Sequence, residues 1–316
     1  MNRKAAVGAA IVGLVALGGV FVARNRERPY DPSFDARVAD PAYAAGGPVV
    51  LYDEGHLNTH TTKGGYKPLA DLIRADGYEL RVTQEPFSAQ TLDEAAILVI
   101  ALARGANDAN DDPAFAAEEI AAAEQWVRSG GSLLLVTDHW PYGKAAAPLA
   151  AAFDVQFGAG LVQDLEHHDP ERGDSHLVFS AENGLLGDHA IVRGRNPSER
   201  IRRVLTFTGQ SILGPPAAVP LLALSGAATE LPPTKPRVTK DGGDVRIDME
   251  YGDPASAAGR AQGLALEHGA GRMVILGEAG MLRAQQDGRV MVGMNVAGYD
   301  NRQLALNILH WLSRVL

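Results

Sequence analysis

Residues 95–102 read AAILVIAL, a run without a single polar side chain. An apolar run of this length is typical of a β-strand that is buried on both faces, as strands are in a parallel sheet covered by helices. The run therefore predicts an α/β fold, provided that the chain on either side alternates between strands and helices.

The flanking segments do alternate in this way. The predicted strands are residues 48–52, 78–83, 95–102 and 132–137, and the predicted helices are residues 66–76, 115–128 and 145–153. Gly77 follows the first helix, where a glycine commonly ends the helical conformation. Helices of this length between strands form βαβ units, so we expect a mostly parallel sheet with helices on both faces.

The pattern breaks over residues 161–259, which are rich in glycine, proline and charge. We interpret this part as an irregular insertion that contains short β-like pieces at residues 203–208 and 219–224. Residues 231–243 (LPPTKPRVTKDGG) read as a surface loop or a partly disordered segment. The insertion interrupts a single α/β domain over residues 48–316 rather than dividing the chain into two domains.

Regular order returns after the insertion. Residues 261–268 and 272–276 are two strand-like runs separated by a Gly-Ala-Gly turn, which predicts a hairpin. Residues 300–315 have the apolar spacing of an amphipathic helix. We expect Leu304, Leu309 and Trp311 on this helix to pack against the sheet.

The N-terminus carries an apolar run, residues 5–23, that has no charged side chain and follows Arg3 and Lys4. About 19 apolar residues are just enough to span a bilayer as a helix, and a basic start before such a run also marks secretory signals. We interpret residues 1–28 as an uncleaved signal anchor or a cleaved signal peptide, followed by a tether over residues 29–47. The main domain is then expected outside the cytoplasm, periplasmic or extracellular, either tethered to a membrane or secreted after cleavage.

The composition excludes several classes of function. The formal net charge is −9 and the chain contains no cysteine. An acidic chain without a basic face is unsuited to nucleic acid, so we expect no nucleic-acid partner. The absence of cysteine excludes disulfides, thiolate metal sites and a cysteine nucleophile.

Charged and polar side chains follow three of the predicted strands. The stretches are DEGHLNTH (residues 53–60), DHWPYG (residues 138–143) and GEAG (residues 277–280). Because ligands bind outside the carboxyl ends of parallel strands, the three stretches are expected to meet at one edge of the sheet. The candidate catalytic residues are Asp53, Glu54, His56, Asp138, His139 and Glu278, and the candidate ligand contacts are Asn58, Thr61, Trp140 and Asn295.

Each of these residues also has a structural interpretation. An aspartate after a strand often caps the next loop or helix, and a loop histidine is often only hydrogen-bonded. A divalent metal ion is a further alternative, with the ligand set His56, His60, Asp138 and His139. If the first of these stretches is a loop, the four-residue spacing of its two histidines carries little weight. Residues 167–169 (HHD) resemble a metal pair but lie in the insertion.

Residues 49–153, with the closing stretches GRMVILGEAGML (residues 271–282) and DNRQLALNILHWL (residues 300–312), resemble the class I glutamine-amidotransferase-like superfamily. The similar branch is a bacterial one, related to auxiliary proteins of gliding-type ABC transporters and to the N-terminal domain of an intraflagellar-transport protein. The resemblance implies a flavodoxin-like sheet with a nucleophilic cysteine on the sharp turn after a central strand. In this chain we assign that turn to Thr137-Asp138-His139, which has no cysteine. Cysteine-dependent glutamine hydrolysis is therefore excluded.

Two functions remain open from the sequence. The first is an exported hydrolase-like enzyme, in which the carboxylates and histidines at the strand ends activate a water, with or without a metal ion. The second is a non-catalytic ligand-binding or adaptor domain of an envelope or ABC-transporter complex. A small molecule or a glycan-type compound is the expected ligand. A purely structural domain would leave the charged strand ends unexplained.

Overall fold

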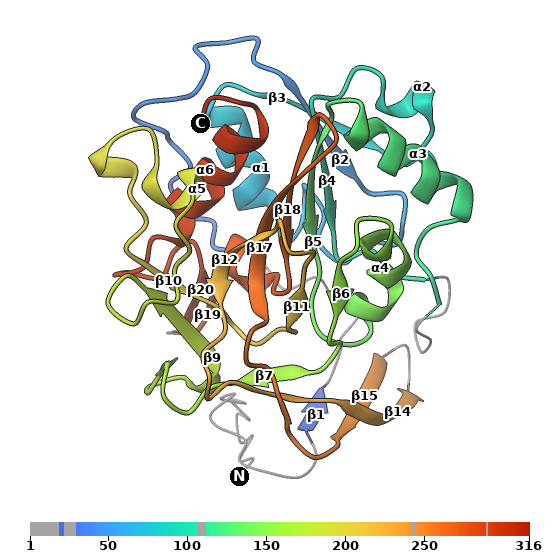
Figure 1. The fold of residues 1–316 in the computed structure, drawn as a ribbon, viewed down its shortest axis with the longest axis vertical. Helices are drawn as coiled ribbons and strands as arrows, with labels where there is room; N and C mark the ends of the chain where they lie inside the picture. Colours follow the sequence, from blue (N-terminus) through green and yellow to red (C-terminus); the bar gives the residue numbers. More distant parts are fainter. Residues whose placement is uncertain (1–18, 22–29, 106–111, 242–243, 289) are drawn as a thin grey trace, which may run out of the picture.

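The structure is a computed structural model, which describes residues 19–21, 30–105, 112–241, 244–288 and 290–316 (Figure 1). Within these residues the largest sheet has nine strands. Eight of them follow the order β3-β2-β4-β5-β18-β17-β11-β6, and β12 pairs with β17. The first five strands in this order are parallel to one another. This is the mostly parallel α/β sheet that the sequence predicts.

The strands of this central sheet are β2 (Val49–Asp53), β3 (Glu79–Thr83), β4 (Ile97–Ala101), β5 (Ser132–Val136), β6 (Gln156–Phe157), β11 (Ile212–Leu213), β12 (Val219–Ala223), β17 (Ala261–His268) and β18 (Gly271–Leu276). Taken in chain order, the five parallel strands are arranged 2-1-3-4-5, which is the flavodoxin-like order. The four strands predicted before the insertion are all present, and β17 and β18 form the predicted hairpin.

The apolar run that predicts the fold is β4, in the middle of the parallel strands. Ile97, Val99 and Ala101 point into one core, and Leu98 and Ile100 point into the other. All five side chains are fully buried. A strand with a core on each face has no room for a polar side chain, which explains its composition.

Helices cover both faces of the sheet, as expected. They are α1 (Lys67–Ala75) and α6 (Asn301–Leu312) over one core, and α2 (Ala89–Leu92), α3 (Ala117–Arg128) and α4 (Tyr142–Ala151) over the other. On α6, Leu304, Leu309 and Trp311 are buried in the first core. The predicted role of these three side chains in packing on the sheet is confirmed.

The insertion is more regular than the sequence suggests. Two of its strands, β11 and β12, join the central sheet. Its other elements are β7 (Leu161–Gln163), β8 (His168–Asp169), β9 (Gly173–Ser180), α5 (Ala190–Arg193), η1 (Pro197–Glu199), β10 (Arg203–Leu205), β13 (Thr229–Leu231), β14 (Pro233–Asp241), β15 (Asp244–Tyr251) and β16 (Ala255–Ser256). The loop prediction for residues 231–243 is wrong, because β14 lies there and pairs with β15. Prolines made that stretch look irregular, but β14 is an edge strand, where prolines are tolerated.

Beyond β18 the chain forms a short helix and a small hairpin before α6. These elements are η2 (Gly280–Leu282), β19 (Ala284–Asp287) and β20 (Val290–Gly293). The sequence analysis predicted none of them. They carry the chain away from the carboxyl end of β18 and back to the start of α6.

The N-terminal segment is described in part. Residues 19–21 form β1 (Gly19–Phe21), which pairs antiparallel with β15. Residues 1–18 and 22–28, the rest of the predicted signal segment, lie outside the described residues. Among the helices that the structure describes, none combines the length and the apolar character needed to cross a bilayer. The predicted tether is bound to the domain from residue 30 onward, for example through the N–H of Asp31, which donates to the carbonyl of Ala284 (2.8 Å).

Leu309→Ala should lower the free energy of unfolding by about 2–5 kcal/mol, because it leaves a cavity between α6 and the sheet. Leu165→Ala is the matched control, since Leu165 is 74% exposed and its loss should cost within about 0.5 kcal/mol. Urea denaturation of both variants measures the difference. Equal effects would show that α6 does not seal the core.

Candidate functional site

The carboxyl ends of β5 and β18 bring two acidic residues together. Val136 pairs with Leu276 in this parallel pair, and the N–H of Thr137 continues the ladder by donating to the carbonyl of Leu276 (2.9 Å). Asp138 and Glu278 each come two residues after these partners. The register therefore places the two side chains next to each other at the edge of the sheet, as the sequence predicts.

Backbone N–H groups hold both carboxyl groups in position. Asp138 accepts hydrogen bonds from the N–H groups of His139 (2.8 Å) and Ala279 (3.2 Å). Glu278 is fully buried and accepts one from the N–H of Met281 (2.8 Å). The side chain of Asp138 remains 13% exposed. Solvent or a ligand can therefore reach the Asp138–Glu278 pair from the side of Asp138.

The electrostatics of the pair favour the protonated acid. Burial raises the pKa of Asp138 above its ordinary value, although the charge of His139 and backbone donors act in the opposite direction. Burial, followed by the negative charge of Asp138, raises the pKa of Glu278 well above its ordinary value. Since two buried acids that lie side by side resist ionising together, their surroundings favour a proton on the pair.

His139 places an imidazole beside this pair. Its Nδ1 lies 3.0 Å from the carbonyl oxygen of Trp140, and its Nε2 lies 3.6 Å from Oδ1 of Asp138. Because a carbonyl oxygen only accepts hydrogen bonds, Nδ1 donates to the carbonyl of Trp140. An imidazole and a carboxyl group therefore face each other at the end of β5.

Two strained segments form one wall of the site. Thr208 adopts a φ of 85° and Ala159 a φ of 63°, and such values are unusual for residues other than glycine. Beside Thr208, Gly209 lies so close to Glu278 that a Cβ on it would come within 2.8 Å of the glutamate Cβ. The buried amide of Gln210 accepts from the N–H of Ala159 (3.0 Å). Strained backbone beside a buried acid pair is typical of a functional site.

Tyr66, the residue before α1, closes the buried side of the pair. Its hydroxyl donates to the carbonyl of Ala279 (2.8 Å), and burial followed by the charge of Glu278 raises its pKa well above the ordinary value. His60 stacks on this ring, with 4.7 Å between the ring centroids. Burial, followed by the charge of Arg283, lowers the pKa of His60 to about 3. His60 is therefore a neutral, packed side chain at pH 7.

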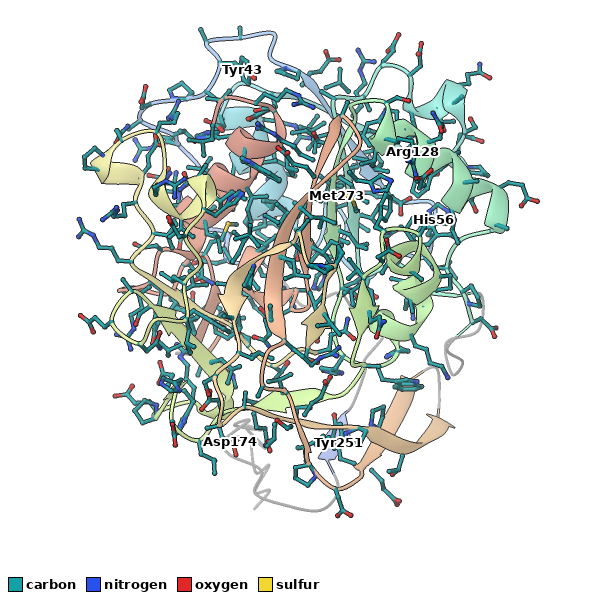
Figure 2. The ribbon with its side chains drawn as sticks, viewed as in Figure 1. Tyr43, His56, Arg128, Asp174, Tyr251 and Met273 are labelled. Atoms are coloured by element: carbon teal, nitrogen blue, oxygen red, sulfur yellow. The ribbon has the colours of Figure 1, made fainter. Side chains whose placement is uncertain are left out.

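The carboxyl end of β2 carries a second, separate cluster. His56 Nδ1 lies 2.8 Å from Oδ1 of Asp53, and its Nε2 lies 2.8 Å from Oε1 of Glu119 on α3. The amide of Asn58 donates to Asp53 (3.0 Å) and to the carbonyl of Ala101 at the end of β4 (3.2 Å). We call Asp53, His56, Asn58 and Glu119 the His56 clasp. Figure 2 shows His56 beside the helices on the right, far from Tyr251 at the base of the molecule.

The His56 clasp is structural. Phe87 and Phe115 cover the His56 ring, each with a centroid distance of 4.7 Å. Burial opposes the charged ring, but the hydrogen bonds and charges of Asp53 and Glu119 outweigh it and raise the pKa of His56. Because both ring nitrogens already contact a carboxylate, His56 has none left to bind a metal ion or to take a proton from water. The clasp instead ties β2 to α3.

Two other predicted residues support the loop that follows β2. Glu54 accepts hydrogen bonds from both the N–H and the hydroxyl of Thr62 (2.7 Å each). Thr61 accepts one from the N–H of Tyr66 through its carbonyl (3.2 Å). Neither contact involves the Asp138–Glu278 pair.

The last two predicted ligand contacts differ in their surroundings. Trp140 is buried, and its N–H donates to the carbonyl of Ala159 in the wall of the site (2.9 Å). Asn295 lies elsewhere, after β20, and its amide donates to Asp31 (3.0 Å). The structure therefore places Trp140 at the Asp138–Glu278 pair and Asn295 away from it.

The structure does not assemble the predicted metal ligands. His56 is held in its clasp, His60 packs on Tyr66, and only Asp138 and His139 are close to each other. Among the described residues there is no group of three or more histidine, aspartate or glutamate side chains that could hold a metal ion. This applies equally to residues 167–169 in the insertion. The four-residue spacing of the two histidines carries no weight because they lie on a loop, not on one helix face.

Sequence reasoning missed three residues of these clusters. Glu119 looks like an ordinary acid in the first turn of a helix, and its partner His56 lies 63 residues earlier. Tyr66 looks like part of an amphipathic helix. Gln210 lies in the insertion, where no motif apart from the neighbouring Gly209 marks it as a site residue. Contacts between residues so far apart in the sequence leave no pattern in any short stretch of it.

The sharp turn expected from the superfamily resemblance is not at residues 137–139. None of these three has a positive φ, whereas Leu102, directly after β4, has a φ of 48°. β4 lies next to the point where the strand order 2-1-3 reverses, which is where such a turn faces a ligand crevice. Leu102 is itself buried.

No protein-family model matches the chain, and no curated protein is similar to it. Among solved structures, the mmIFT52 N-terminal domain matches with a TM-score of 0.55 and 14% sequence identity, over 84% of this chain and 96% of that one. A ThuA-like protein from Bacteroides uniformis ATCC 8492 matches with a TM-score of 0.39 and 12% identity, over 89% of this chain and 95% of that one. At these identities, the likeness to the mmIFT52 domain is one of fold.

His56→Gln should destabilise the protein more at low pH than at high pH. The clasp raises the pKa of His56 in the folded state, so its contribution is fully present below the unfolded value of about 6.5 and is lost as the pH rises through the folded value. Urea denaturation at about pH 5.5 and about pH 9 measures this. His60→Gln is the control with the opposite trend, because its lowered pKa makes its contribution fade as the pH falls. A pH-independent loss in His56→Gln would argue against the clasp.

Asp138→Asn should lower the pKa of Glu278, because it removes the negative charge that disfavours ionisation of the glutamate. Carboxyl-carbon NMR of the labelled glutamates, followed against pH, reports this shift. Asp53→Asn removes a carboxylate from the other cluster and should leave the Glu278 titration unchanged. The same titration curve in wild type and Asp138→Asn would show that the two acids do not interact.

Proposed function

We propose that this chain is an exported, membrane-tethered member of the class I glutamine-amidotransferase-like superfamily that acts as a hydrolase at the Asp138–Glu278 pair. The observation that carries the proposal is the pair itself, two neighbouring buried acids whose pKa values are both raised, beside the imidazole of His139. Groups whose pKa is shifted toward neutrality are the ones that exchange protons efficiently in catalysis. The ligand is a small molecule or a glycan-type compound.

The geometry suggests a role for each group. Glu278 is fully buried, so it would store the proton, and Asp138, whose side chain is 13% exposed, would deliver that proton to a leaving group. His139, whose side chain is 15% exposed, would take a proton from a water through Nε2. Asp138 lies between them and would pass the proton on. This division of labour follows the rule that paired titrating groups held at different pKa values serve as acid and base.

Covalent catalysis is not part of the proposal. The chain has no cysteine, and the left-handed turn after β4 carries Leu102 in place of a nucleophile. A water molecule is therefore the attacking group. The apolar run of residues 5–23 supports export and tethering, and the acidic composition supports the absence of a nucleic-acid partner.

A second candidate function is a non-catalytic ligand-binding or adaptor domain of an envelope or ABC-transporter complex. The observation that favours it is Leu102, because an apolar residue at the strained turn is what a domain that has lost a catalytic nucleophile would contain. The fold likeness to the mmIFT52 N-terminal domain is compatible with this candidate. Turnover separates the two candidates, since an adaptor would bind its ligand and leave it intact.

Chromogenic esters, glycosides and phosphate esters offered to the full-length protein test the proposal. Hydrolysis of one class is expected, and both Asp138→Asn and Glu278→Gln should lower its rate by about 10²- to 10⁴-fold, the usual contribution of a general acid or base. Asp188→Asn, which alters a carboxylate that is 93% exposed, should leave the rate unchanged. Activity that survives both substitutions would contradict the proposal, and binding without turnover would favour the adaptor.

A further inference from the structure

The insertion is joined to the Asp138–Glu278 pair through its innermost strand. The N–H of Val162 on β7 donates to the carbonyl of Gly209 (2.9 Å), and Gly209 packs directly on Glu278. Leu231 on β13 pairs with Leu161 on β7, and the chain then enters β14 two residues later. The β14–β15 hairpin therefore begins close to the pair, and Figure 1 shows it beyond the carboxyl ends of the parallel strands.

Tyr251, the last residue of this hairpin, has a buried hydroxyl without a hydrogen-bond partner among the described residues. Its backbone is fixed, since Tyr251 pairs with Pro233 and the next N–H, of Gly252, donates to the carbonyl of Pro232 (2.8 Å). Burial, followed by the charge of Asp138, raises the pKa of Tyr251 to about 12. A buried hydroxyl that makes no hydrogen bond is costly, so its presence calls for an acceptor that the described residues do not supply.

The charges around the pair favour a neutral ligand. Asp138 is the carboxyl group of the pair that a ligand can reach. The positive charge of Arg283 acts on Tyr66 and His60 but is not among the charges that act on Asp138 or Glu278. An anionic ligand would therefore meet Asp138 without compensation from Arg283. An uncharged ligand needs no further charge to be buried.

We propose that the β14–β15 hairpin holds the Tyr251 hydroxyl over the Asp138–Glu278 pair, where it donates a hydrogen bond to an uncharged carbonyl or hydroxyl oxygen of the ligand. This role rests on the proposed function, because both place the ligand at the same pair. Tyr66 cannot take this role, since its hydroxyl is already committed to the carbonyl of Ala279. Tyr251 is therefore a ligand-contacting residue that the insertion supplies to the sheet edge.

NMR titration of the full-length protein with labelled tyrosine rings tests this role, using acetamide as the neutral probe and acetate as its charged isostere. The Tyr251 signal, assigned by its loss in Tyr251→Phe, should move with acetamide and not with acetate. Tyr251→Phe should weaken acetamide binding by about threefold to tenfold, the usual effect of losing one neutral hydrogen bond. Tyr78 is the matched control, because it is a buried tyrosine before β3, at the opposite edge of the sheet, and its hydroxyl contacts Ser313 (2.8 Å). Its signal should not move, and Tyr78→Phe should bind acetamide as the wild type does.

A Tyr251 signal that ignores acetamide, or that responds equally to acetate, would overturn the inference. The proposed function is judged separately, by turnover in Asp138→Asn. If turnover depends on Asp138 but the Tyr251 signal does not respond to acetamide, the role of Tyr251 is refuted and the hydrolase proposal is still supported. A responsive Tyr251 with turnover that ignores Asp138 would support the contact and refute the hydrolase.

Discussion

The parallel pairing of β5 with β18 is the contact on which the rest of the structure depends. β5 ends the first α/β half of the chain, and β18 returns only after the whole insertion. Their backbone ladder joins the two parts across the centre of the sheet and aligns Val136 with Leu276. The position of both strand ends, and hence the closeness of Asp138 and Glu278, follows from this single register. A shift by one residue would turn one of the two side chains to the opposite face of the sheet.

The two clusters at the carboxyl edge use the same residue types in opposite ways. In the clasp, one imidazole lies between two carboxylates, and their attraction stabilises the charged form of His56. In the Asp138–Glu278 pair, two acids are buried together, which stabilises the protonated form. The first arrangement strengthens the fold, and the second is held in place by the backbone around it. Burying two acids together lowers the stability of the fold, and such a loss of stability is a common feature of functional sites.

The sequence was sufficient for the parts that depend on local patterns. The apolar run of residues 95–102 predicted β4 and the parallel sheet. The rule that ligands meet strand ends predicted that residues 53–60, 138–143 and 277–280 would converge, but only the last two stretches do so, because His56 and Asp53 bind Glu119 and Asn58 instead. It failed where the partner is distant in sequence. The contacts of His56 depend on Glu119 on α3, and the position of Tyr251 depends on how the insertion folds. The sharp turn was misplaced for a similar reason, because the left-handed φ of Leu102 leaves no mark on the sequence.

The central claim is that the Asp138–Glu278 pair holds a proton at neutral pH, and infrared spectroscopy observes such a proton directly. A protonated carboxyl group absorbs apart from carboxylates and from the amide backbone, and isotope labelling of glutamate identifies its source. The structure predicts a protonated-acid band at neutral pH that shifts on glutamate labelling and disappears in Glu278→Gln. A spectrum in which every carboxyl group is ionised at neutral pH would contradict the account.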